Sequence, residues 1–176
     1  SIRRQRQMCI RDRHARLRQI MRKTATPTIR WQWATFDELS GTALYAALRA
    51  RQDVFVLEQQ CLYADIDGDD QRAFHLLGWN AADDTQLFAY LRCFAPGDKY
   101  PEAALGRVLT TQPARGFGFG KQLLTEGMRR VEQHFPGSAI RISAQEHLQR
   151  FYAGFGFQAV SEMYMEDGIP HIEMLR

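Results

Sequence analysis

Three glycines at alternate positions, Gly116, Gly118 and Gly120, form the segment of this 176-residue chain best suited to bind an anion. Glycine has no Cβ atom, so a ligand can approach the backbone N–H groups closely. An apolar run precedes the glycines and an amphipathic helix pattern follows them. The N-terminus of that helix would add the positive end of its dipole. The order of strand, glycine turn and helix therefore predicts a phosphate-binding site that a pyrophosphate would fit.

The spacing of this turn excludes two common phosphate-binding loops. A P-loop needs G-x-x-x-x-G-K-S/T, but Arg115 stands at the first glycine position and Gln122 follows Lys121, which leaves no hydroxyl for magnesium. The dinucleotide fingerprint G-x-G-x-x-G fails because the third glycine comes two residues after the second. The segment 115–120 instead resembles the Q/R-x-x-G-x-G/A turn of the GCN5-related N-acetyltransferases, the GNAT family, in which the turn holds the pyrophosphate of acetyl-CoA.

A second motif follows at a spacing similar to that in the family. Residues 139–144 have the composition of a short buried strand, residues 146–152 that of a helix, and residues 154–157 are Gly-Phe-Gly-Phe. GNAT proteins carry a similar strand and helix with a Phe-Tyr-x-x-x-Gly-Phe ending. The resemblance extends to the smaller ElaA-like group and spans residues 29–176. The further segments that carry it are 54–59, 65–70, 75–79, 144–148 and 166–171.

The resemblance implies an α/β (α+β) fold, with a mixed, mostly antiparallel central sheet flanked by helices. A central parallel strand pair would splay apart to admit the pantetheine arm. The hydrophobic pattern predicts a helix from near Ser40 to Gln59, broken near Asp53 and with Leu57 among its core positions. A second long helix is expected over residues 117–135. The expected strands are residues 29–35, 73–80, 86–94, 103–111, 139–144, 157–163 and 169–175.

The family resemblance also implies the cofactor contacts. Backbone groups of Val108, Leu109 and Thr110 are expected to pair with the pantetheine amides, because an extended ligand can add to a strand edge. The Arg115 side chain and a set of backbone N–H groups would hold the pyrophosphate. Those N–H groups belong to Gly116, Gly118, Phe119, Gly120 and Lys121. Gln145, at the end of a strand, could hydrogen-bond the cofactor or orient the catalytic tyrosine.

Tyr152 is the candidate general acid. Its reference pKa of about 10 is similar to that expected of an alkyl thiol, so its hydroxyl could protonate the departing CoA thiolate. Many GNAT enzymes place a glutamate base on the strand before the glycine turn, but that strand offers Arg107 here. The base is therefore expected elsewhere, at Glu58 or His75, with His171 or an acidic loop residue as alternatives. A purely structural role stays open for each of these side chains.

An acidic loop, residues 65–70, contains four aspartates. A calcium-binding EF-hand loop needs glycine at its sixth position and glutamate at its twelfth, whereas Gly68 is fourth and Leu76 twelfth here, so no metal site is expected. Two interpretations stay open. The loop could be an acidic lip that attracts a cationic amine, or a solvated turn.

Charge is divided unevenly along the chain. Residues 1–28 hold nine Lys or Arg and one acidic residue, whereas residues 29–176 hold 14 basic and 19 acidic residues. The acidic balance of the second part argues against nucleic acid as a partner. Residues 1–28 could be a targeting presequence, an arm for nucleic acid or a membrane surface, or a non-native extension. We expect the last, because residues 1–13 resemble translated adapter sequence and ElaA-like proteins begin near Ile29.

Composition completes the functional prediction. The three cysteines form no C-x-x-C pair and no run of about 18 apolar residues occurs, so we expect a reduced, cytoplasmic protein without a membrane segment. The resemblance implies an N-acetyltransferase that moves an acetyl group directly from acetyl-CoA to a small or cationic amine, on a small molecule or a peptide. The alternative is a catalytically weak CoA-binding or regulatory module. Assembly into a homo-oligomer stays open.

Overall fold

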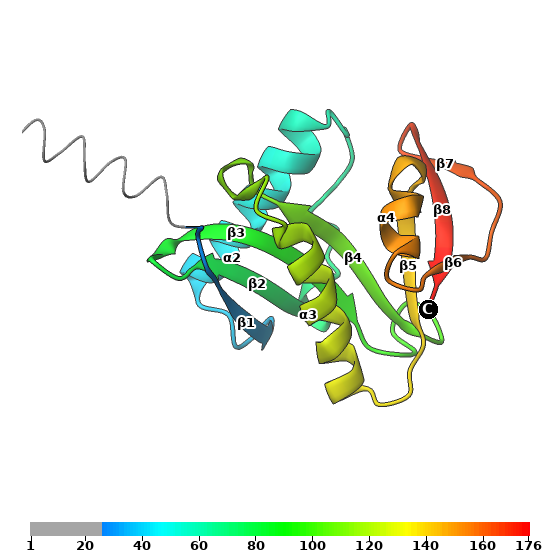
Figure 1. Cartoon of the computed structure of the whole chain (residues 1–176), viewed down its shortest axis with the longest axis horizontal. Coiled ribbons are helices and arrows are strands. Elements are labelled where there is room, and N and C mark those ends of the chain that lie inside the picture. Colours follow the sequence, from blue (N-terminus) through cyan, green and yellow to red (C-terminus); the bar gives the residue numbers. More distant parts are fainter. Residues whose placement is uncertain (1–25) are drawn as a thin grey trace, which may run out of the picture.

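The computed structural model describes residues 26–176, so the expectation that residues 1–28 are a non-native extension falls almost entirely outside the described residues. Figure 1 shows the arrangement of the elements. In chain order they are β1 (Ile29–Thr35), α2 (Gly41–Arg51), η1 (Gln52–Glu58), η2 (Asp70–Arg72), β2 (Phe74–Asn80), β3 (Asp83–Phe94), β4 (Ala103–Thr110), η3 (Gln112–Ala114), α3 (Phe119–His134), β5 (Ile140–Gln145), η4 (Glu146–Leu148), α4 (Gln149–Ala153), β6 (Gln158–Ala159), β7 (Tyr164–Glu166) and β8 (Ile169–Leu175).

A single mixed sheet runs through the molecule. Its strands follow the order β1-β2-β3-β4-β5-β8-β6, and β7 pairs with β8. Every pair is antiparallel except β4 with β5, which is parallel. This confirms the expected mixed, mostly antiparallel sheet. The strand expected over 157–163 is wrong in length, because β6 covers only Gln158–Ala159 and β7 starts later, at Tyr164.

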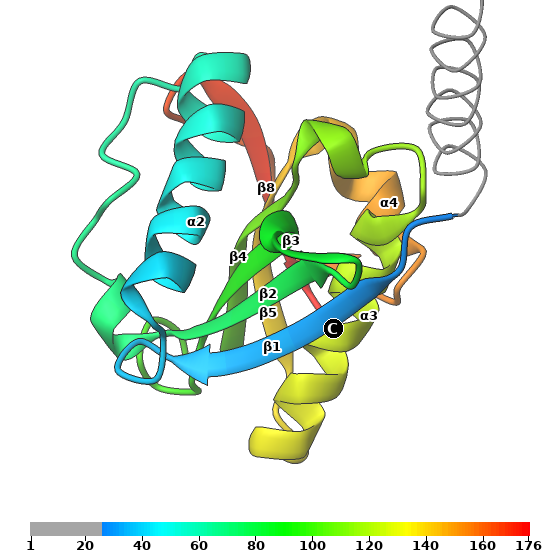
Figure 2. The same ribbon diagram turned by 90° about the vertical axis from the view of Figure 1, so that its left-hand side faces the viewer.

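Helices cover both faces of the sheet, and Figure 2 shows α2 and α3 on opposite sides of it. Successive strand residues point to opposite faces, so Leu76 and Leu77 of β2 enter different cores. Leu76 belongs to the core that includes Leu123 of α3. Leu77 belongs to the core that includes Ala47 of α2. Between residues 26 and 176, no helix combines the length and apolar character needed to cross a bilayer.

The first helix begins where the sequence predicts and then changes type. The Ser40 side-chain oxygen accepts the Ala43 N–H at 3.1 Å, which satisfies one free donor at the start of α2. After Arg51 the chain continues as η1, a π-helical turn, in place of the predicted break near Asp53. A π-turn has more residues per turn than an α-helix and so rotates the following side chains. Leu57, expected in the core, is accordingly 63% exposed.

The parallel strands β4 and β5 diverge soon after they begin. Ala103 lies beside Ile140 and Ala104 beside Arg141, and these are the paired positions of the two strands among the described residues. Beyond them β4 leans away from β5, as Figure 1 shows. The predicted splayed parallel pair is therefore confirmed.

A β-bulge in β4 lies directly after this divergence. Gly106 pairs with Arg92 of β3, and Leu109 pairs with Tyr90, which leaves two residues of β4 opposite one of β3. Arg107, inside the bulge, has a left-handed φ of +51°. A bulge bends its strand and re-aims the side chains that it carries. Here it contributes to the wall of a cleft.

Candidate active site

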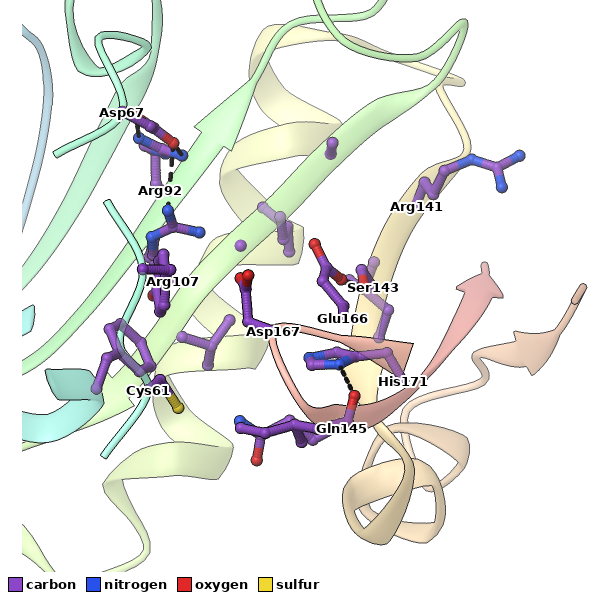
Figure 3. A pocket seen from close by; sticks show the side chains of 18 of the residues that line it. Cys61, Asp67, Arg92, Arg107, Arg141, Ser143, Gln145, Glu166, Asp167 and His171 are labelled. Atoms are coloured by element: carbon purple, nitrogen blue, oxygen red, sulfur yellow. Dashed lines mark hydrogen bonds and ion pairs between the residues drawn. The ribbon is translucent and has the colours of Figure 1, made fainter. Parts of the chain in front are cut away.

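A cleft of about 370 Å³ occupies the space between the diverging strands. Residues 104–108 of β4 form one wall and residues 141–145 of β5 form the other. The loop after η1, residues 59–64, and the turn between β7 and β8 close it from the front, and Figure 3 shows several of these side chains pointing into it. A cleft of this kind, open along a strand edge, can hold an extended ligand.

Tyr152 lies in the cleft, as the sequence predicts. It comes from α4, its side chain is 6% exposed, and its ring packs edge-on against Phe151 and Phe157. Burial raises the pKa of its hydroxyl to about 12. Because the hydroxyl keeps its proton at neutral pH, Tyr152 can act as a proton donor inside the cleft.

The glycine turn has the open backbone that anion binding requires. Gly116 and Gly118 adopt left-handed φ angles of +83° and +77°, and a Cβ atom at either position would meet no protein atom within 4 Å. Gly118 is the N-cap of α3. Within residues 26–176, no protein group accepts a hydrogen bond from the N–H groups of residues 116–120. These donors are therefore available to a ligand.

One member of the turn, Lys121, differs from the expectation, and another, Phe119, agrees with it. The Lys121 N–H donates to the Gly118 carbonyl at 3.1 Å, because the first turn of α3 is tighter than an ideal α-helix, so this donor is already used. Phe119 is buried and stacks on Phe88 at 5.5 Å between ring centres, which leaves only its backbone for a ligand. The accessible donors thus belong to residues 116–120.

Arg115 is already bound to another predicted site residue, Glu58. The two side chains form a bidentate ion pair, with Nη–Oε distances of 2.7 and 2.9 Å. Arg115 also donates to the Thr110 carbonyl at 3.3 Å. The hydrogen bond from Arg115 lowers the pKa of Glu58, which weakens it as a base. Glu58 lies at the glycine turn, outside the lining of the cleft.

His75 lies in the protein core, away from the cleft. Its Nδ1 is 2.8 Å from the Tyr90 hydroxyl and its Nε2 is 3.0 Å from the Asp70 carbonyl. The side chain has no exposed surface, and burial lowers its pKa. With both ring nitrogens occupied, His75 is built as a structural histidine. The structure therefore brings neither Glu58 nor His75 to Tyr152.

The three residues of β4 that are predicted to bind pantetheine do not all line the cleft. Val108 lines it, whereas the Leu109 side chain turns into the core on the α2 side of the sheet. Thr110 offers a carbonyl that Arg115 already contacts. Gln145 lines the cleft from the end of β5, and its Nε2 donates to Oε1 of Gln59 at 3.2 Å.

His171, predicted only as an alternative base, does line the cleft. It pairs with Gln145 across β5 and β8. Its Nδ1 is 2.9 Å from the Ile169 carbonyl, so Nδ1 carries a proton there and Nε2 is left with a lone pair. A neutral imidazole held in this tautomer can accept a proton through Nε2.

Glu166 and Asp167, next to this histidine, are lining residues that sequence reasoning did not assign. Both stand at the turn between β7 and β8. The Ser143 hydroxyl donates to Glu166 at 2.9 Å. Asp167 and Gly168 have successive positive φ angles, which fits a two-residue hairpin turn. The Asp-Gly pair between two short apolar runs was the sequence signal for this turn.

The loop at residues 65–70 is neither an unpaired acidic lip nor a fully solvated turn, although Asp67 lines the cleft and residues 66–68 are exposed. Asp65, Asp67 and Asp70 are ion-paired to three arginines from distant elements, Arg51, Arg92 and Arg107. The N–O distances are 2.8 and 2.7 Å for Arg51 with Asp65 and Asp70, 2.6 and 2.8 Å for Arg92 with Asp67 and Asp70, and 2.7 Å for Arg107 with Asp65. The charges cancel within the cluster, so the loop has little field left to attract an amine.

Comparison with known proteins agrees with this geometry. Residues 43–176 match the family model described as acetyltransferase (GNAT) domain, and the chain therefore belongs to the GNAT acyltransferase family. Within that family it is similar to the ElaA group. It is 43% identical to Protein ElaA of Escherichia coli over 150 residues, which cover 84% of this chain and 96% of that protein.

Solved structures show the same fold. An acyl-CoA N-acyltransferase from Pseudomonas aeruginosa superposes with a TM-score of 0.80 and is 40% identical, covering 85% of this chain and 99% of that one. Escherichia coli ElaA superposes with a TM-score of 0.78 and is 42% identical, with the same coverage. The predicted family and fold are confirmed.

Proposed function

We propose that this protein transfers an acetyl group directly from acetyl-CoA to an amine. The observation that carries the proposal is a cleft with a splayed parallel strand pair and a buried tyrosine, together with a glycine turn that follows β4 and has unused N–H donors. The strand pair suits the pantetheine arm, the turn suits the pyrophosphate, and the tyrosine lies between the strands where the thioester would end.

Cofactor binding would use the glycine turn and the edge of β4. The free N–H groups of Gly116, Gly118, Phe119 and Gly120 would hold the pyrophosphate at the positive end of α3. The pantetheine amides would pair with the backbone of residues 108–110. Arg115 would add a charge-assisted contact by sharing its guanidinium between Glu58 and the phosphate.

The proposed chemistry needs one acid and one base. The amine nitrogen attacks the thioester carbonyl carbon, the C–S bond breaks, and the Tyr152 hydroxyl donates its proton to the departing thiolate. His171 Nε2 accepts the proton that the amine loses, since its Nδ1 is fixed by the Ile169 carbonyl. In this proposal His171 replaces Glu58 and His75 as the base.

Cofactor binding is tested by Gly118→Asp. The new side chain and its charge would stand where the pyrophosphate is proposed to lie, so calorimetric titration should find greatly weakened acetyl-CoA binding. Gly137→Asp is the matched control, because Gly137 has a similar φ of +75° and open space around it but follows the far end of α3. Equal affinity in folded Gly118→Asp and in the control would contradict the pyrophosphate assignment.

The acid and base are tested by Tyr152→Phe and His171→Gln. Loss of the proton donor in Tyr152→Phe should lower kcat by about 10²- to 10⁴-fold with little change in acetyl-CoA affinity. His171→Gln should lower kcat, because glutamine at this position cannot accept the proton that the amine loses. A fall of less than about threefold for Tyr152→Phe would instead favour a packing role.

The alternative function, a catalytically weak CoA-binding or regulatory module, draws on one observation. Two of the three predicted catalytic side chains, Glu58 and His75, are held in other contacts. A panel of amines distinguishes the two functions. Release of CoA that depends on an added amine supports the transferase, whereas binding of acetyl-CoA without such release supports the module.

A further inference from the structure

We infer that the acceptor carries an anionic group as well as its amine, with Asp167 holding the ammonium and Lys99 holding the anion. This inference rests on the proposed function, because it concerns the acceptor of the same reaction. It names an acceptor class, amino-acid-like amines, and two specificity residues.

Most charged side chains in the lining are already neutralised. Asp67 pairs with Arg92 at 2.6 Å, and Arg107 pairs with Asp65 at 2.7 Å. Arg141 pairs with Glu102 at 3.0 Å. These ion pairs leave little charge for an acceptor to meet along the β3, β4 and β5 walls.

Asp167 and Lys99 are the exceptions in the lining. Within residues 26–176 neither forms an ion pair, although both face the same cleft. Glu166, beside Asp167, accepts hydrogen bonds only from the hydroxyls of Ser143 and Tyr164. The cleft therefore offers one unmatched cation and one unmatched carboxylate pair.

Asp167 is held over the centre of the cleft by its backbone. Its φ of +50° belongs to the tight turn between β7 and β8. Figure 3 shows its carboxylate between Arg107 on one wall and Glu166 on the other. Its negative charge contributes, after burial, to the raised pKa of the Cys61 thiol on the loop that follows η1. The turn thus reaches across the cleft and can present a carboxylate to an entering ammonium.

Lys99 stands at the other end, in the loop between β3 and β4. This loop leads into Ala103 and Ala104, where β4 and β5 still pair, so it closes the end of the cleft at which the two strands are closest together. The Lys99 Nζ lies 5.8 Å from the centres of the Phe94 and Tyr100 rings. Both rings line the cleft and lie within cation–π distance of the Lys99 ammonium, which is exposed to solvent.

These two charges select among amines. A zwitterion whose two charges are spaced to match the separation of the two side chains can meet Asp167 with its ammonium and Lys99 with its carboxylate, whereas a simple monoamine leaves Lys99 without a partner. A diamine brings a second positive charge toward Lys99 and is repelled there. The acceptor preference is therefore for an amine with a carboxylate, in place of the generally cationic amine that the sequence suggested.

The test compares free L-amino acids, their C-terminal amides and linear diamines as acceptors at fixed acetyl-CoA. For one amino acid and its amide, we expect kcat/KM to favour the acid by about tenfold or more, because a charge-assisted hydrogen bond is lost in the amide. Lys99→Met should raise KM for the acid and leave the amide unchanged, so the ratio falls toward one. Asp167→Asn should raise KM for both and leave acetyl-CoA affinity unchanged.

Matched controls separate these effects from general changes of surface charge. Asp84→Asn and Arg49→Met change exposed charges outside the cleft and should leave the ratio of acid to amide as in the parent protein. If amides and diamines react as well as the acids, the inference is wrong while the proposed function holds. If acetyl-CoA binds and no amine releases CoA, the proposed function itself fails and the inference fails with it.

Discussion

Two acidic regions of this protein face the same cleft and have opposite electrostatic characters. The paired loop, residues 65–70, contains four aspartates, yet all four are ion-paired to arginines. The open turn, Glu166–Gly168, contains two carboxylates, and within the described residues neither forms an ion pair. The region with more carboxylates therefore offers less charge to a ligand. The partners of a carboxylate, more than the number of carboxylates, decide what field it presents.

The two regions also differ in the role that we assign to them, which is stability for the paired loop and substrate recognition for the open turn. Arg51 and Arg92 are 1% and 2% exposed, so their charges have lost nearly all contact with water. Such a cluster is tolerable only while each charge keeps its partners, because an uncompensated buried charge costs several kcal/mol. The paired loop is accordingly a structural device that fixes the front wall of the cleft. The carboxylates of the open turn form no such ion pairs within the described residues, so they can exchange bound water for a substrate.

The largest expected effect comes from breaking the paired loop. Arg51→Met would leave the buried carboxylates of Asp65 and Asp70 with fewer partners, and we expect it to lower the free energy of unfolding by about 3–5 kcal/mol. Urea denaturation measures this change. Arg129→Met, which removes an exposed arginine from its pair with Glu126, is the control and should stay within about 0.5 kcal/mol of the parent. Equal stability of the two variants would contradict the comparison.

The second largest effect is expected at low pH, where the paired loop should lose part of its contribution to stability. Burial raises the pKa of Asp67 and Asp70, but hydrogen bonds from Arg92 outweigh this and hold both below the unfolded value. Carboxyls with a depressed folded pKa contribute stability above their unfolded pKa of about 3.9 and lose it as pH falls through the folded value. Urea unfolding should therefore show stability falling below about pH 4, less steeply in Asp67→Asn. An unchanged slope in that variant would assign the acid sensitivity to other groups.

A smaller effect is expected at Glu58 and Arg115. This ion pair is more exposed than the buried pairs of the paired loop, yet within residues 26–176 its carboxylate has a charged partner, unlike those of the open turn. Glu58→Gln would release Arg115 for the pyrophosphate, so acetyl-CoA should bind about two- to fivefold more tightly, in the range of an exposed ion pair. Calorimetric titration measures the affinity and steady-state kinetics measures kcat. A large loss of kcat without tighter binding would restore Glu58 as the base.

The smallest effect is expected at Asp69, the remaining carboxylate of the paired loop. It contacts only Arg72, in an exposed pair three residues away. Asp69→Asn should change the unfolding free energy by about 0–1 kcal/mol and leave the acceptor KM the same at low and high salt. A salt-dependent rise in KM for a cationic amine would revive the idea that this loop attracts the acceptor.

Local patterns in the sequence were sufficient to predict most of the scaffold and to propose residues for the cofactor half of the site. The glycine spacing at 116–120 and the helix pattern after it are contiguous, so their geometry follows from a few neighbouring residues. Tyr152 could be predicted for the same reason, because it belongs to a short motif with a fixed position relative to the preceding strand. The exception within this half is Lys121, whose N–H is used by a tighter first turn than the pattern indicates.

The acceptor half depended on contacts between residues far apart in the chain. Arg51 meets Asp70 across 19 residues, Arg107 meets Asp65 across 42, and Arg115 meets Glu58 across 57. No local pattern indicates which arginine will neutralise which carboxylate, so the four aspartates of residues 65–70 looked like a charged surface. The sequence by itself predicted most of the strands along the chain and, through its resemblance to the GNAT family, the mixed sheet and the candidate residues for the anion site and the acid. Only the tertiary structure decided which charges cancel and which, at Asp167 and Lys99, form no ion pair within the described residues, because the strength of a charge depends on the partners and the water that the fold leaves around it.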